Sequence, residues 1–200
     1  MAGLADQPLT RFLDVVRSTD PAPGGGSGAA IAAAIGAALL EMSAGIELAR
    51  ERPGDDEQIA PDSVTRASEL RRRALELADQ DLSSFAPVLD ALRLPQSDPG
   101  RGARLELALG DASRVPIEIA EAGATAAELA LAVATASPNT VRGDALAAVL
   151  LSEAATATAT VLVEINLAGQ DDGPDIARVR DARRRAQEAR DDALALLPRR

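Results

Sequence analysis

The stretch Pro23-Gly24-Gly25-Gly26-Ser27, followed at once by a long run rich in alanine, decides the fold and marks the candidate site. Three consecutive glycines carry no Cβ atoms, so the backbone there can approach another chemical group closely. A helix is predicted to begin near Ser27, and the first amides of a helix have no intrahelical acceptor while its dipole favours negative charge. The stretch therefore predicts a site for an anion or a carbonyl group. The alternative is a flexible loop capped by Ser27.

Two familiar glycine-rich motifs are excluded. A P-loop requires a lysine after its last glycine, and this chain contains no lysine. A dinucleotide-binding fingerprint follows a β-strand, whereas the residues before the glycines have the spacing of a helix. Leu9, Phe12, Leu13 and Val16 recur at i, i+3, i+4 and i+7 and form one apolar stripe. The glycine stretch therefore belongs to neither class.

Helical periodicity continues through the rest of the chain and predicts an all-α protein. Residues 27–52 and 140–167 are apolar on nearly every side, which predicts two central alanine-rich helices surrounded by amphipathic ones. Pro87 and Pro116 are predicted to break helices. No segment has the alternation or the β-branched and aromatic enrichment of a strand. We therefore expect residues 1–200 to form a single-domain helical bundle.

The composition of the core predicts an oligomer in which the chain shares a face with a second copy. Apolar residues make up 46% of the chain, but aromatic residues only 1%. A core built mainly from alanine has little side-chain volume, so the helices must approach closely or a second copy must add buried area.

Charge and hydropathy restrict the partners. The net charge is −10 and no basic stripe is interleaved with aromatic residues, which argues against a nucleic-acid partner. The N-terminus lacks the basic region and apolar core of a secretory signal. The most apolar segment, residues 24–45, is rich in alanine and glycine and carries Glu41, which makes it a poor candidate for a membrane span. We expect a cytoplasmic protein without a membrane partner.

The residue types that are missing restrict the chemistry. The chain has no histidine, cysteine, lysine, tyrosine or tryptophan. This excludes Ser-His-Asp and Cys-His catalysis, a lysine Schiff base and an ordinary zinc site, and we expect no metal. Acid–base catalysis by carboxylates and electrostatic stabilisation remain.

Four polar residues outside the glycine stretch are candidates. Asp79 and Asp81 lie in the third predicted helix, and because residues two apart do not share a helix face, at most one of them points into a given cleft. Asn139 and Asp144 lie at the start of the second central helix. Asn139 can serve as an N-cap, whereas Asp144 lies among apolar residues and needs a partner or a ligand if it is buried. A solvated helix face is the alternative for Asp79 and Asp81, and the general preference for aspartate near a helix start is the alternative for Asp144.

These motifs, taken in order, resemble the cyclodeaminase/cyclohydrolase family. Its helical domain forms the C-terminal half of formiminotransferase-cyclodeaminase and also exists alone as methenyltetrahydrofolate cyclohydrolase. The family's proline, glycine triplet and serine before an alanine-rich helix are similar to Pro23 to Ala30. The other matching pieces are Asp79 and Asp81 before Phe85 and Leu94-Pro95, then Val115-Pro116, then Asn139 with Asp144-Ala145, and finally Ile165-Asn166-Leu167. Their order and approximate spacing hold from about residue 8 to residue 170.

The resemblance implies an all-helical homodimer that acts on one-carbon units of tetrahydrofolate, with a folate derivative as substrate and no prosthetic group. One family reaction closes formimino-tetrahydrofolate to the methenyl form with loss of ammonia, and the other adds water to the methenyl form to give 10-formyl-tetrahydrofolate. Both pass through a tetrahedral carbon and require proton transfer, for which we predict Asp144 and Asp81. The predicted substrate contacts are Gly24, Gly25, Gly26, Ser27, Asn139, which would orient the substrate, and Arg142, which would meet an anionic group.

Two alternatives to a folate enzyme remain open at this point. The chain departs from the family pattern at Gln96, Pro138, Gly143 and Leu162, where the family carries lysine, glycine, serine and asparagine. These departures favour a divergent member that acts on a non-folate cyclic amidine or imine. The absence of the usual catalytic side chains favours a non-catalytic helical dimer.

Overall fold

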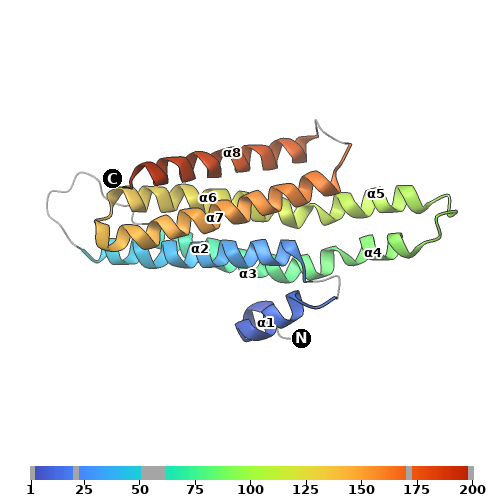
Figure 1. The fold of residues 1–200 in the computed structure, drawn as a ribbon, viewed down its shortest axis with the longest axis horizontal. Helices are drawn as coiled ribbons and strands as arrows, with labels where there is room; N and C mark the ends of the chain where they lie inside the picture. The colour runs from blue at the N-terminus through green and yellow to red at the C-terminus, as the bar shows by residue number, and fades with distance from the viewer. Residues whose placement is uncertain (1–2, 20–22, 51–61, 170–172, 198–200) are drawn as a thin grey trace.

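The computed structural model describes residues 3–19, 23–50, 62–169 and 173–197, and within these ranges every regular element is helical, as predicted (Figure 1). The elements are the short 3₁₀ helix η1 (Leu4–Asp6) and the α-helices α1 (Leu9–Val16), α2 (Gly25–Leu48), α3 (Ser63–Ser84), α4 (Ala86–Arg93), α5 (Arg101–Ala112), α6 (Arg114–Ala136), α7 (Asn139–Asn166) and α8 (Pro174–Ala195).

The long helices α2, α3, α6, α7 and α8 form an elongated bundle (Figure 1). Helices α6 and α7 lie in the middle, with α2 and α3 on one side and α8 on the other. Helices α4 and α5 pack against each other and extend past one end of the bundle, while α1 lies outside it. The candidate site lies where this pair of helices leaves the bundle.

The two predicted central helices correspond to α2 and α7. Helix α2 begins at Gly25, inside the glycine run and two residues before the predicted start. It ends at Leu48; the predicted end at Arg52 lies outside the described residues. Helix α7 lies within one residue of the prediction at both ends. Helix α6 is equally central, because both its proline-containing first turn and most of its alanines are buried.

The two helix breaks expected at prolines are observed. Helix α3 ends at Ser84, and the chain continues through Phe85 into α4, which carries Pro87 in its first turn. Helix α5 ends at Ala112, and α6 begins two residues later with Pro116 in its first turn. Because proline lacks the amide that an interior helix position uses, both segments stop and restart near the same end of the bundle.

Two glycines allow the alanine-rich helices to approach closely. A Cβ added to Gly36 of α2 would lie 2.4 Å from Ser152 Oγ and 3.2 Å from the carbonyl oxygen of Ala148, both on α7. A Cβ added to Gly123 of α6 would lie 2.5 Å from Thr156 Oγ1 and 2.9 Å from the Ser152 carbonyl oxygen. The backbones of α2 and α6 therefore rest directly on α7, which compensates for the small side chains of the core.

Substitution of either crossing glycine should destabilise the protein. Gly36→Ala and Gly123→Ala are each expected to lower the free energy of unfolding by about 1–3 kcal/mol, because the added methyl group overpacks the helix crossing. Gly45→Ala in α2 is the control, since its added Cβ meets nothing within 4 Å. Urea denaturation measures all three, and a wild-type midpoint for Gly36→Ala would contradict the close crossing.

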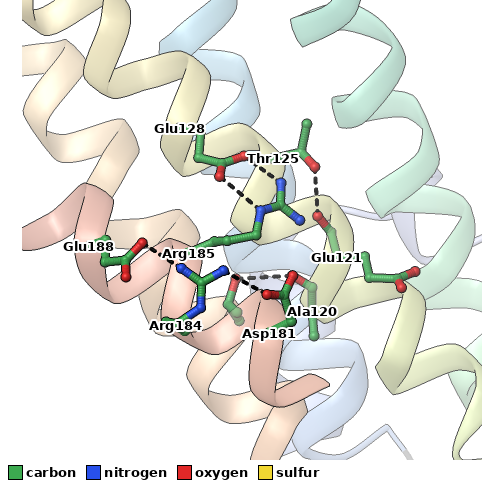
Figure 2. Close-up of polar contacts among 9 residues, drawn as sticks. Ala120, Glu121, Thr125, Glu128, Asp181, Arg184, Arg185 and Glu188 are labelled. Carbon is green, nitrogen blue, oxygen red and sulfur yellow. Dashed lines mark hydrogen bonds and ion pairs between the residues drawn. The ribbon is translucent and has the colours of Figure 1, made fainter. Parts of the chain in front are cut away.

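Helix α8 attaches to α6 through arginine–carboxylate pairs. Figure 2 shows Arg185 of α8 facing Glu128 of α6, with hydrogen bonds to both carboxylate oxygens. Seven residues earlier on each helix, Arg178 of α8 binds both carboxylate oxygens of Glu121 of α6 at 2.9 and 3.0 Å. Exposed ion pairs contribute only about 0–1 kcal/mol each, so they orient α8 while its buried apolar row, which includes Val179, holds it to the bundle.

Three stretches have the length and apolar composition needed to cross a membrane. They are Gly25–Leu48, Arg101–Ala136 and Asn139–Asn166, and between 44% and 50% of the most apolar window of each is buried inside the bundle. The expectation that the alanine-glycine helix is too weakly hydrophobic for a span is not confirmed by this measure. Apolar character on all sides is also expected of helices at the centre of a bundle.

Candidate active site

The glycine stretch lines a cleft of about 160 Å³ at the end of the bundle where α2 begins and α3 ends. Helices α5, α6 and α7 contribute the rest of its wall. The lining residues all lie at or near helix ends; they are Gly24, Gly25, Gly26, Asp81, Ser84, Phe85, Ala112, Pro116, Leu162 and Asn166. The helix breaks at the two prolines thus bring distant parts of the sequence to one place.

Asp81, on the last turn of α3, points at the first turn of α2. Ser27 Oγ donates a hydrogen bond to Asp81 Oδ2 at 2.9 Å, and the Ser27 backbone amide also bonds this carboxylate. The other oxygen, Oδ1, lies against Gly26, where an added Cβ would be only 2.1 Å away. Gly24 occupies the N-cap position and has no side chain to offer. Asp81 therefore caps α2 from a neighbouring helix, and Gly26 makes room for it.

Burial raises the pKa of Asp81 above its ordinary value, and the hydrogen bonds from the Ser27 hydroxyl and amide counteract part of that rise. Among the described residues that line the cleft, Asp81 is the only titratable side chain. A carboxyl whose pKa moves toward neutrality is suited to exchange protons with a substrate. This combination of cleft and perturbed carboxyl is typical of a catalytic site.

Asp79 has a different role. Its Oδ1 accepts a hydrogen bond of 2.6 Å from the backbone amide of Leu4 and so holds the N-terminal segment on α3. This confirms the expectation that Asp79 and Asp81 do not point into the same cleft. Asp79 is a structural residue here.

Ser27, a predicted substrate contact, does not line the cleft. The predicted hydroxyl contact requires exposure to the cleft, but Ser27 is fully buried and does not line it. Its hydroxyl instead faces Asp81 and the carbonyl oxygen of Ala78. Ser27 lies at the third residue of α2, one position too deep in the helix to reach the cleft.

The second group of predicted residues lies at the opposite end of α7. Asn139, Arg142 and Asp144 belong to its first two turns, whereas Leu162 and Asn166 line the cleft. Asp144 and Leu162 are separated by roughly 27 Å along the helix at 1.5 Å per residue. Within one chain the structure therefore does not bring this group together with the glycine stretch, because the group lies at the start of α7 and the cleft that contains the glycine stretch lies at the end of α7.

Arg142 stabilises the end of α6. Its Nε donates to the carbonyl oxygens of Ala134 and Ser137 at 3.2 and 3.1 Å, and Nη2 donates to Ser137 at 2.8 Å. These are the last carbonyls of a helix, where the dipole favours a cation. Its Nη1 binds Asn139 Oδ1 at 3.2 Å. These contacts explain Arg142 without a substrate.

Asn139 and Asp144 are exposed in the single chain. The N-cap of α7 is Pro138, with no side-chain cap, so the predicted capping role of Asn139 is not observed. The buried apolar surroundings expected for Asp144 are also not found, because its side chain lies on the outer surface of α7.

Several residues that line the cleft are not among the site residues that the sequence predicts. The motifs that carry the family resemblance include three of them, Phe85, Pro116 and Asn166. Membership in these motifs could therefore have marked the three residues as candidates. Leu162 was noted only as a departure, and nothing in the sequence marks Ser84. In the part of the chain that the structure describes, no group of three acidic side chains is placed to hold a metal ion.

Comparison with known proteins identifies the family. The family model described as formiminotransferase-cyclodeaminase matches residues 8–187. Methenyltetrahydrofolate cyclohydrolase from Methylorubrum extorquens is 31% identical over 176 residues, which cover 86% of this chain and 84% of that protein. Formimidoyltransferase-cyclodeaminase from Mus musculus is 32% identical over 122 residues, which cover 59% of this chain and 23% of that longer protein.

The fold is also shared with a solved structure. The crystal structure of formiminotetrahydrofolate cyclodeaminase from Thermotoga maritima superposes with a TM-score of 0.82, covers 96% of both chains and is 24% identical in sequence. The similarity predicted from the ordered motifs is thus confirmed by sequence and by fold. Since the family model spans most of its length, this chain belongs to the formiminotransferase-cyclodeaminase family.

Proposed function

We propose that this protein is an enzyme of tetrahydrofolate one-carbon metabolism that hydrolyses methenyl-tetrahydrofolate to 10-formyl-tetrahydrofolate. The observation that carries the proposal is the Asp81 carboxyl, which lies in a cleft against the first turn of a helix and has a raised pKa. A relative matched over 84% of its own length has the name methenyltetrahydrofolate cyclohydrolase. That match favours hydrolysis over the other family reaction.

Asp81 supplies the proton transfer in this proposal. The methenyl carbon bonds two nitrogens and carries positive charge. The ionised carboxylate takes a proton from water while the water oxygen bonds to that carbon, which gives a neutral tetrahedral intermediate. The carboxyl then returns the proton to one nitrogen as its bond to the carbon breaks. The remaining hydroxyl proton leaves to solvent as the formyl C=O forms.

The rest of the cleft supplies polarity and shape. Gly25 and Gly26 occupy the first positions of α2, where helix geometry provides no acceptor for the amides. These amides are suited to hold the attacking water oxygen, which becomes partly hydroxide-like while Asp81 takes its proton. Phe85 and Leu162 form apolar walls for a planar ring, and Asn166 offers a polar side chain at the rim.

An absorbance assay tests the proposed reaction. Purified protein should accelerate the loss of the near-ultraviolet absorbance of methenyl-tetrahydrofolate well above the rate in buffer. A rate equal to that of buffer, from protein with a native helical spectrum, would contradict the proposal and favour a non-folate cyclic amidine or imine as substrate.

Closure of formimino-tetrahydrofolate with loss of ammonia is the second candidate. The match to the mouse formimidoyltransferase-cyclodeaminase favours it, and the same carboxyl would move the proton to the departing nitrogen. Ammonia release from formimino-tetrahydrofolate distinguishes the two reactions, because hydrolysis of the methenyl form releases none.

We further propose that the enzyme is a cytoplasmic homodimer in which a second copy covers the outer faces of α2 and α7. These neighbouring helices leave large apolar side chains exposed in the single chain. Ile35 and Met42 on α2 are 47% and 43% exposed, and Val161 and Ile165 on α7 are 44% and 64% exposed. Rows of this kind on central helices are typical of surfaces that a partner buries.

A two-fold axis across α7 would also explain how Asn139 and Asp144 reach a cleft although they lie far from the cleft of their own chain. An axis perpendicular to this helix near its midpoint exchanges its two ends between the copies. The exposed Asp144 and Asn139 of each chain would then lie beside the cleft of the other chain. On this proposal their predicted roles in catalysis and substrate orientation are carried out across the interface.

Introduction of a charge on the α7 face should dissociate the dimer. Val161→Asp is expected to halve the molecular mass measured by sedimentation equilibrium in detergent-free buffer, because the carboxylate would be buried without a partner. Ala177→Asp on the exposed face of α8 introduces the same charge outside the proposed interface and should leave the mass unchanged.

Two outcomes would contradict the dimer. One is a monomeric wild-type protein at high micromolar concentration. The other is a wild-type protein that partitions into lipid vesicles, which would assign the apolar faces of α2 and α7 to a membrane.

A further inference from the structure

We infer that Ser27 is a positioning residue whose hydroxyl keeps Asp81 hydrogen-bonded in both of its protonation states and thereby sets the pH at which Asp81 exchanges its proton. The inference rests on the proposed catalytic role of Asp81. It assigns to Ser27 a function other than the substrate contact that the sequence predicts.

The geometry gives the Ser27 hydroxyl two acceptors. Its Oγ lies 2.9 Å from Asp81 Oδ2 and 3.3 Å from the carbonyl oxygen of Ala78, one turn earlier on α3. A hydroxyl has one proton and two lone pairs, so it donates to one of these oxygens at a time and remains free to accept. Because Ser27 is fully buried, water does not compete for it.

Each protonation state of Asp81 selects one orientation of this hydroxyl. When Asp81 is ionised, the hydroxyl donates to the carboxylate, since a hydrogen bond to a charged acceptor is the stronger one. When Asp81 carries a proton on Oδ2, that proton is donated to Ser27 Oγ, and the hydroxyl turns to the Ala78 carbonyl. Neither state leaves the Ser27 hydroxyl or the Asp81 carboxyl without a partner, and rotation of the Ser27 hydroxyl is the only change that Ser27 makes between them.

No described side chain that lines the cleft or lies on the last turns of α3 stabilises the ionised form of Asp81 with a positive charge. Asp79, two residues away, points to the amide of Leu4. The described residues that line the cleft include no arginine, and its other polar side chains, Ser84 and Asn166, are uncharged. The ionised carboxylate is therefore stabilised by Ser27, through its hydroxyl and its amide, and not by a cation.

Removal of the hydroxyl should raise the pKa of Asp81 further, because it removes a bond that favours the ionised form. In Ser27→Ala we expect an upward shift of about 1–2 pH units, the equivalent of one hydrogen bond to a charged group. The carbon-13 shift of the Asp81 carboxyl, followed by NMR during a pH titration of the free protein, measures this directly. Ser27→Cys keeps the volume with a weak donor and should shift the titration in the same direction.

Ser43→Ala is the matched control. Ser43 lies on the same helix and is fully buried, and its hydroxyl has no hydrogen-bond partner among the described residues. Its removal should leave the Asp81 titration unchanged. A titration of Asp81 that moves by less than about 0.3 unit in both folded Ser27 variants would overturn the inference, since one charged hydrogen bond corresponds to a larger shift.

The pH dependence of kcat/KM separates this inference from the proposed function. The acid limb should move upward by the same amount in Ser27→Ala, with the rate recovered at higher pH, whereas general damage to the fold would lower the rate at every pH. If the NMR titration moves and the acid limb does not, Ser27 positions Asp81 but Asp81 is not the catalytic base.

Discussion

Asp81→Asn is expected to lower the rate of methenyl-tetrahydrofolate hydrolysis by about 10²–10⁴-fold, the usual contribution of a positioned acid–base group. Asparagine has nearly the same shape and can still accept hydrogen bonds from Ser27, so the first turn of α2 should remain capped. It cannot take a proton from water. The initial rate of the absorbance change measures the loss.

The melting temperature of Asp81→Asn tests whether the loss of activity is local to the cleft. Burial raises the pKa of Asp81 in the folded state above its unfolded value. Its contribution to stability is therefore present below the unfolded pKa and is lost as the pH rises through the folded pKa. At neutral pH Asp81→Asn removes a charge that costs stability, so its melting temperature should equal or exceed that of the wild type.

Asp79→Asn is the matched control for this prediction. It makes the same chemical change two residues away, on a side chain that binds the Leu4 amide outside the cleft. Its activity should stay within a few-fold of the wild type. Equal losses in the two variants, or full activity in Asp81→Asn, would contradict the assignment of Asp81.

Gly26→Ala is expected to lower the same activity by about 10²-fold or more. The added methyl group would lie 2.1 Å from Asp81 Oδ1, so the carboxylate must move away from the start of α2. A displacement of about 1 Å at a catalytic group is sufficient for a loss of this size. Steady-state kinetics should show the loss mainly in kcat.

Gly28→Ala is the control for the glycine substitution. Gly28 lies two residues further along α2, and its added Cβ meets nothing within 4 Å. Activity in this variant should be close to wild type. Wild-type kcat in Gly26→Ala would show that the close approach of Asp81 to the backbone has no catalytic role.

Local signals in the sequence were sufficient to predict the helices and to select the glycine stretch and Asp81, which the structure brings together at one cleft. Pro87 and Pro116 lack an amide donor, which determines where α3 and α5 end and therefore where the cleft forms. The glycine run predicts a helix start that another group approaches closely, and Asp81 is that group. These predictions hold because each depends on the backbone chemistry of a few neighbouring residues.

The contacts of the other predicted residues required knowledge of the tertiary structure. Nothing local shows that Arg142 faces the last carbonyls of α6, or that the Ser27 hydroxyl faces Asp81. Both contacts join different helices, and their geometry depends on how those helices pack. Asp144 lies near the start of α7, and the cleft residues Leu162 and Asn166 lie near its end. The ordered motifs include residues from both ends, but this order does not make them neighbours within one chain.

A crystal structure of the protein with a non-reactive folate analogue tests directly whether the cleft beside Asp81 is the substrate site. We expect the ring system to occupy the cleft beside Gly25, with the one-carbon bridge within about 3–3.5 Å of a water molecule or group held by Asp81. An analogue bound at the Asn139 end of α7, with the cleft beside Asp81 empty in every copy of the chain, would contradict this assignment.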